Sequence, residues 1–143
     1  MILGRALLAA LVALATGFGA PPVAAEAGKI AVEFNDLQQS ETGCRAVFVL
    51  NNGLDKPLDK VTLRVVAFDA ESHAKLFLSL DVGALPIGKT RVMRFDLGPD
   101  LACKDVSRIV LDDVTSCEGA EMAPPACLAA ISLSSRAGAP FDF

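Results

Sequence analysis

The chain has 143 residues, with 13 Lys and Arg against 17 Asp and Glu, so its formal charge is −4. This length accommodates a single domain. There is no Trp and no Tyr, which excludes a sugar-binding platform built on those side chains. The acidic balance also argues against nucleic acid as a partner, because binding it needs a clustered basic face and usually aromatic stacking.

Residues 1–25 have the pattern of a secretory signal peptide. Arg5 supplies the positive charge, residues 6–20 form an apolar segment, and small residues precede a cleavage site after Ala25. As an uncleaved anchor, a fifteen-residue helix would extend roughly 22 Å, less than the ~30 Å hydrocarbon core of a bilayer. Residues 6–25 contain no second Arg, so the twin-arginine pattern is missing and the segment predicts a Sec-type signal cleaved near Ala25. We expect a periplasmic or secreted protein whose mature chain does not insert into the membrane.

After this segment, apolar residues alternate with polar ones at period two, and no helical stripe is evident. Turn residues separate the alternating runs, as in 51–53, 86–88 and 98–99. This spacing predicts an all-β fold, namely a seven-stranded antiparallel β-sandwich of immunoglobulin or fibronectin-III type over residues 26–136. Residues 137–143 are expected to form a C-terminal tail. The expected strands contain residues 30–34, 44–52, 61–69, 76–82, 93–97, 109–111 and 131–133.

Four cysteines, Cys44, Cys103, Cys117 and Cys127, lie in the region expected to be exported, where disulfides form. Three pairings are possible. In an up-and-down order of strands, Cys44 and Cys103 fall at one end of the sandwich, and Cys117 and Cys127 at the other. Since a disulfide needs Cα atoms within about 7 Å, we predict the pairs Cys44–Cys103 and Cys117–Cys127.

The residues offer little for catalysis. His73 is the only histidine and lies in a predicted turn, and no G-x-S-x-G or C-x-x-C sequence is present. We therefore expect no catalytic residue and no cofactor, and a protein that is not an enzyme.

Acidic residues gather at Asp112, Asp113, Glu118 and Glu121. Calcium accepts carboxylate oxygens, but the calcium-loop pattern is missing, and neighbouring Asp112 and Asp113 should point to opposite faces of a strand. A solvated acidic end without metal is the expectation. A small-ligand or divalent-cation binding protein that uses this end is the alternative function.

Three apolar residues are expected on outward faces, namely Val66 and Phe68 in the third strand and Phe77 in the fourth, beside Arg64 and Lys75. Exposed apolar patches often mark contact sites. Val66, Phe68 and Phe77 are therefore a candidate partner surface, unless residues 137–143 cover them.

Four segments between residues 50 and 97 resemble FxLYD-type domains: Asn51-Asn52-Gly53, 57–61, 65–69 and 85–90. Phe68 stands where that pattern has Tyr, and Lys89 where it has Glu. The whole chain is also similar to small exported proteins of Gram-negative bacteria that carry a Tat-signal label. These resemblances imply an extracytoplasmic, immunoglobulin-like module, and they imply no catalytic residue.

Together these features predict an exported, non-catalytic β-sandwich that serves as a protein-interaction or structural module of the cell envelope. Its partner would be another envelope protein. The residues do not specify an oligomeric state.

Overall fold

The computed structural model describes residues 26–119 and 121–143, so the predicted signal peptide lies outside the described residues. Eight strands, a 3-10 turn η1 (Cys103–Asp105) and one short helix α1 (Pro124–Ala130) make up the fold. The strands are β1 (Ile30–Ser40), β2 (Gly43–Asn52), β3 (Leu58–Phe68), β4 (Ala74–Leu85), β5 (Thr90–Asp96), β6 (Arg108–Glu118), β7 (Ile131–Ser135) and β8 (Phe141–Asp142).

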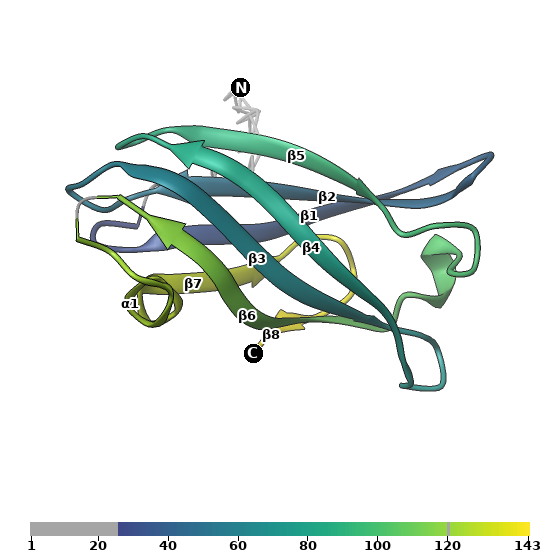
Figure 1. Cartoon of the computed structure of the whole chain (residues 1–143). Coiled ribbons are helices and arrows are strands. Elements are labelled where there is room, and N and C mark those ends of the chain that lie inside the picture. The colour runs from purple at the N-terminus through teal and green to yellow at the C-terminus, as the bar shows by residue number, and fades with distance from the viewer. Residues whose placement is uncertain (1–25, 120) are drawn as a thin grey trace, which may run out of the picture.

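The strands form two four-stranded sheets, as Figure 1 shows. Sheet A has the order β5-β2-β1-β7, and sheet B has the order β4-β3-β6-β8. The all-β prediction is confirmed, but the expectation of seven antiparallel strands is corrected. There are eight, and β7 runs parallel to β1 while β8 runs parallel to β6. For β7 the reason lies in where the chain crosses back to sheet A. Strand β6 finishes at the same end of the sandwich at which β1 starts, so β7 starts there too and runs in the direction of β1.

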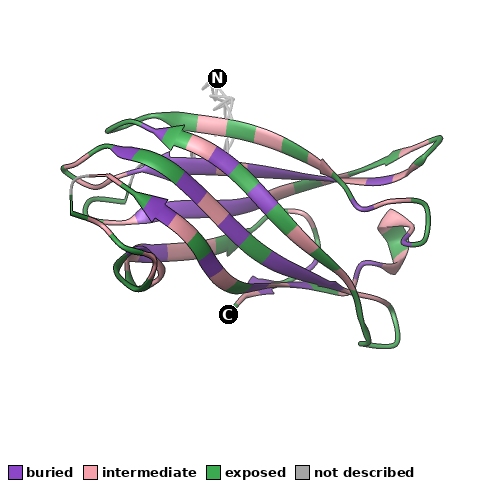
Figure 2. Ribbon diagram, in the orientation of Figure 1, coloured by how far each residue is buried: buried purple, intermediate pink, exposed green. Residues whose placement is uncertain are grey.

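Period-two alternation produces the core, because successive side chains of a strand point to opposite faces. Figure 2 shows the resulting bands of buried and exposed residues along the strands. The largest side chains that are almost fully buried come from both sheets and from the residue directly after β5: Phe34, Phe48, Ile30, Leu50, Leu58, Leu63, Leu80, Leu85, Ile109 and Leu97.

The segment 137–143 is not the free tail that was expected, because it contributes β8 to sheet B. Phe141 is buried, and its ring lies 5.5 Å from that of Phe48 and 6.3 Å from that of Phe34. Aromatic pairs at such separations add to the energy of burial. The last strand therefore closes the core.

Helix α1 was also not predicted. It is only seven residues long and buries only Cys127, so it carries no apolar stripe that could reveal it. Two prolines, Pro124 and Pro125, occupy its first turn, where their fixed φ angle favours a helix start.

Both predicted disulfides are present, Cys44–Cys103 with Cα atoms 4.9 Å apart and Cys117–Cys127 with Cα atoms 6.4 Å apart. Each one holds a crossing between the sheets. Cys103 lies in η1, where the chain passes from β5 to β6, and Cys127 lies in α1, where it passes from β6 to β7. Two disulfides are typical of proteins from oxidising, extracytoplasmic compartments.

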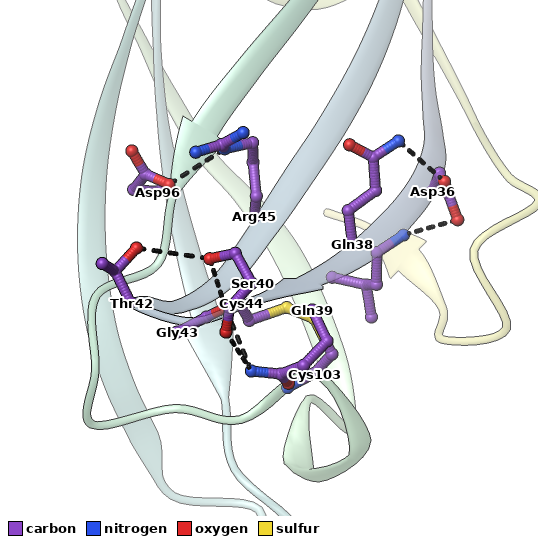
Figure 3. Close-up of a disulfide and its surroundings, with 11 residues drawn as sticks. Asp36, Gln38, Gln39, Ser40, Thr42, Gly43, Cys44, Arg45, Asp96 and Cys103 are labelled. Atoms are coloured by element: carbon purple, nitrogen blue, oxygen red, sulfur yellow. Dashed lines mark hydrogen bonds and ion pairs between the residues drawn. A yellow bond between two sulfur atoms is a disulfide. The ribbon is translucent and has the colours of Figure 1, made fainter.

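The first of these crossings is also held by hydrogen bonds, as Figure 3 shows. The side chain of Gln39, near the end of β1, accepts the backbone N–H of Cys103 at 3.1 Å and donates to the carbonyl of Gly43 at 3.0 Å. The β1–β2 turn, the disulfide and η1 therefore form one unit.

Asn52 holds two further crossings at the opposite end of the sandwich. Its side chain is fully buried and donates to the carbonyls of Leu85 at 2.8 Å and Lys56 at 3.0 Å, while its oxygen accepts the N–H of Leu54 at 3.0 Å. One carboxamide thus satisfies backbone groups of both the β2–β3 crossing and the β4–β5 crossing. Buried backbone groups without such partners would be costly.

We predict that the substitution Asn52→Ala lowers the free energy of unfolding by about 3 kcal/mol, because one buried and two partly buried backbone groups lose their partner. Urea unfolding measures the change. Asn51→Ala is the matched control. The Asn51 side chain bonds to Thr90 and, at 3.4 Å, to Gly88, so its loss should cost about 1 kcal/mol. Equal losses in the two variants would contradict the role given to Asn52.

We predict unequal losses on removing the two disulfides by double Cys→Ala replacement. The chain-entropy model assigns about 4 kcal/mol to Cys44–Cys103, which spans 59 residues, and about 3 kcal/mol to Cys117–Cys127, which spans 10. Urea unfolding of the two variants under identical conditions compares them. A larger loss for the short loop would contradict the entropic account.

Candidate functional site

The outward face of sheet B brings apolar residues of three strands together. In register across the sheet, Phe77 of β4 lies opposite Val66 of β3, which lies opposite Val110 of β6. Phe68 follows two residues after Val66 on the same face, because Val65 and Ala67 point into the core. We call Phe77, Val66, Val110 and Phe68 the outer strip.

The members of the outer strip differ in exposure. Phe77 is 67% exposed, whereas Val66 is only 6% exposed between its two neighbours. Phe68 is partly buried, with the guanidinium of Arg108 5.9 Å from its ring centroid, a cation–π contact. Of the three residues predicted as a partner surface, Phe77 is therefore the accessible one. The segment 137–143 does not cover it.

Ion pairs flank the outer strip on both sides. On one side, Nε of Arg64 lies 2.5 Å from a carboxylate oxygen of Asp112, and Nη2 of Arg64 lies 3.6 Å from one of Asp113. On the other, Arg108 contacts Asp142 through two nitrogens, the shorter distance being 2.6 Å. Of the two basic residues expected beside the patch, Arg64 and Lys75, Arg64 is thus neutralised by its neighbours.

The expectation that Asp112 and Asp113 point to opposite faces is wrong. Val65 pairs with Leu111 and Arg64 pairs with Asp113, so Asp112 is an extra residue in β6. This is a β-bulge, in which two residues of one strand oppose one residue of the other. The bulge lets both carboxylates reach Arg64.

The structure does not bring the four predicted acidic residues into one cluster. Glu118 lies five residues beyond Asp113, 4.0 Å from Nζ of Lys60, and accepts a hydrogen bond from Ser116 at 3.1 Å. Glu121 is exposed beyond the end of β6. Among residues 26–119 and 121–143, no group of three or more His, Cys, Asp or Glu side chains is arranged to hold a metal ion.

His73 lies in the turn between β3 and β4. The carboxylate of Asp69 accepts the backbone N–H groups of Glu71 and His73 at 3.1 and 2.9 Å, which is how Asp commonly stabilises a turn. The exposed imidazole has its Nδ1 3.8 Å from the same carboxylate. These contacts are those of a surface turn.

Val110 and the Arg108–Phe68 contact were missed by sequence reasoning. The alternation Arg108, Val110, Asp112 beside the buried Ile109 and Leu111 could have placed Val110 on the outward face. Its position opposite Val66 depends on the pairing of β3 with β6, which the pattern of either strand alone does not contain.

Comparison of the chain with models of known protein families, with curated proteins and with solved structures finds no match. The resemblance to FxLYD-type domains therefore stays a prediction. Within the part of the chain that the structure describes, no helix is long and apolar enough to cross a membrane.

We predict that calcium leaves the melting temperature unchanged, because Asp112 and Asp113 already share Arg64. A ligand that binds only the folded state raises the melting temperature by mass action, so thermal unfolding with increasing calcium tests this. Asp113→Asn is the control variant. A calcium-dependent rise in the native protein that disappears in Asp113→Asn would favour the alternative, a cation-binding protein.

Proposed function

We propose that this protein is an exported, non-catalytic β-sandwich of the cell envelope that acts by contact with another envelope protein through the outer strip. The observation that carries the proposal is Phe77, a large apolar side chain that is 67% exposed on a paired strand. Large aromatic side chains dominate the energy of many protein interfaces. Fully burying one Phe side chain stabilises a complex by roughly 1.5–3 kcal/mol.

The surroundings of Phe77 support an interaction surface. Val66 and Val110 extend the apolar area across the sheet, and the Arg64 and Arg108 ion pairs form a polar margin on either side. An apolar centre with a polar rim is the usual anatomy of a protein interface. Because the paired strands hold the backbone, little conformational entropy would be lost on binding.

Two features support the proposed location in the periplasm. Residues 1–25 have the pattern of a signal peptide cleaved near Ala25. The two disulfides need an oxidising compartment, and the periplasm provides one.

The strand order supports an immunoglobulin-like fold. If β1 to β6 correspond to strands A, B, C, C′, E and F, then sheet A contains the order E-B-A and sheet B the order C′-C-F, as in immunoglobulin domains. The arrangement departs from that fold at β7, which lies beside β1 and not beside β6. The strand beside β6 is β8, which runs parallel to it. The proposal is thus an immunoglobulin-like sandwich whose last two strands are rearranged.

We predict that a photo-crosslinking amino acid placed at position 77 links the protein to one envelope protein in intact cells, identified by mass spectrometry. Position 87 is the matched control, because Ile87 is also exposed, at 56%, but lies in the β4–β5 turn outside the outer strip. The adduct should form from position 77 only.

A second variant tests whether the apolar side chain itself drives binding. Phe77→Ser should weaken binding of the identified partner by about tenfold or more, as expected for an interface residue worth at least 1.4 kcal/mol, while Ile87→Ser should not. Equal adducts from positions 77 and 87, or unchanged affinity of Phe77→Ser, would contradict the proposal.

A further inference from the structure

Strand β4 is the long open edge of sheet B. It pairs with β3 on one side, and no strand within residues 26–119 and 121–143 pairs with its other side. From residue 76 to residue 81 its pairing with β3 is regular, and this stretch contains no Pro and no charge before Asp81. An edge of this kind presents a row of unpaired backbone groups that can pair with another chain.

The other edge strands are better protected. In β5, charged side chains interrupt the strand at Arg91, Arg94 and Asp96. Nε of Arg91 also donates to the carbonyl of Ala84 at 2.7 Å, which occupies the end of β4 but leaves residues 76–81 uncovered. Strand β7 has only five residues and β8 only two. Charges and short length are the usual protections of an edge, and the centre of β4 has neither.

The side chains of β4 are also incompletely covered. Leu76 and Leu78 pack against the core but are only partly buried. Phe77, between them, is exposed on the other face. Both faces of the strand would gain apolar contact from a neighbouring strand.

The sequence of β4 is complementary to itself when run antiparallel. Lys75 and Asp81 lie three residues before and three residues after Leu78, and both are exposed. They stand at the two ends of the regular stretch: Lys75 is the extra residue of the bulge between the pairs Ala67–Leu76 and Phe68–Ala74, and a carboxylate oxygen of Asp81 accepts a hydrogen bond from the N–H of Gly83 at 3.2 Å. With a two-fold axis at Leu78, Lys75 of each copy faces Asp81 of the other. Cross-strand pairs of opposite charge are stabilising.

The apolar residues fit the same register. Leu76 lies opposite Leu80 of the second copy on the core side, and Phe77 lies opposite Ser79 on the outer side. Moving the axis by one residue, to Phe77 or to Ser79, breaks both ion pairs, because Asp81 would then face His73 or Phe77. The charges thus favour the register centred on Leu78 over the registers centred on Phe77 and Ser79.

We propose that two copies of this chain associate through antiparallel pairing of β4 with β4, centred on Leu78. The two copies of sheet B become one continuous sheet, and the interface is isologous, as in most homodimers. This inference rests on the open edge of β4 and not on the proposed function, but the two share Phe77, which would lie at the seam of the dimer, and the dimer would place the outer strips of both copies on one face. Lys75 and Asp81 lie outside the outer strip, so changes there test the dimer separately.

Charge reversal is the first test, with the protein isolated with both disulfides formed. Sedimentation equilibrium should show a dimer whose dissociation constant rises about tenfold in Lys75→Asp and in Asp81→Lys, because each variant places like charges opposite one another at two symmetric positions. The double variant should restore dimerisation. Lys89→Asp, an exposed charge in the β4–β5 turn, is the control and should have no effect. Thermal unfolding verifies that each variant is folded.

Covalent trapping tests the register. Two Leu78→Cys chains would face each other directly and form an intermolecular disulfide on mild oxidation. Two Ser79→Cys chains would be diagonal neighbours, about 7–8 Å apart, beyond the usual span of a disulfide, so this variant should stay uncrosslinked.

The proposal is overturned by a native protein that stays monomeric at millimolar concentration. It is also overturned if charge reversal leaves the dimer unchanged, or if Ser79→Cys crosslinks as efficiently as Leu78→Cys. None of these results would affect crosslinking from position 77 to an envelope partner, so the two proposals fail separately.

Discussion

The structure depends on how the chain is held where it crosses between its two sheets. Crossings follow β2, β4, β5, β6 and β7, and each of the first four is held by a buried amide or a disulfide. Asn52 bonds to the β2–β3 and β4–β5 crossings at one end, while Cys44–Cys103 and Cys117–Cys127 hold the next two. At the last crossing, Oγ of Ser135 donates to the carbonyl of Ala139 at 2.5 Å. Because backbone groups that leave a sheet lose their ladder partners, these contacts let two small sheets share one core.

Alternation along the chain was enough to predict the all-β class, the position of most strands and, through the direction of each strand, the disulfide pairing. The alternation did not predict the direction of a strand where that direction depends on how the chain crosses between the sheets. Helix α1 carries the chain back to sheet A at the end where β1 begins, so β7 is parallel to β1. Residues 137–143 were expected to be a tail, yet Phe141 in this segment completes an aromatic cluster. A strand of two residues, such as β8, is too short to show a recognisable period-two alternation.

For the candidate surface too, the sequence of one strand predicted only part of what the structure shows, here at the level of single residues. Outward placement of Val66, Phe68 and Phe77 follows from period two, but their exposure depends on neighbours in other strands. Val66 is covered by Phe77 and Val110, and Phe68 lies under Arg108. The bulge at Asp112 turns two carboxylates toward one Arg, which reverses the expectation for a regular strand. Lateral pairing, and not the sequence of one strand, determines which apolar residue solvent can reach.

The placement of both disulfides at crossings makes the folded state conditional on its surroundings. Together they contribute about 7 kcal/mol in the chain-entropy model, comparable to the entire net stability of a small domain. In a reducing compartment, where glutathione keeps thiols free, the same polypeptide would lack this contribution to its stability. The redox state of the surroundings therefore decides how firmly the two sheets stay joined.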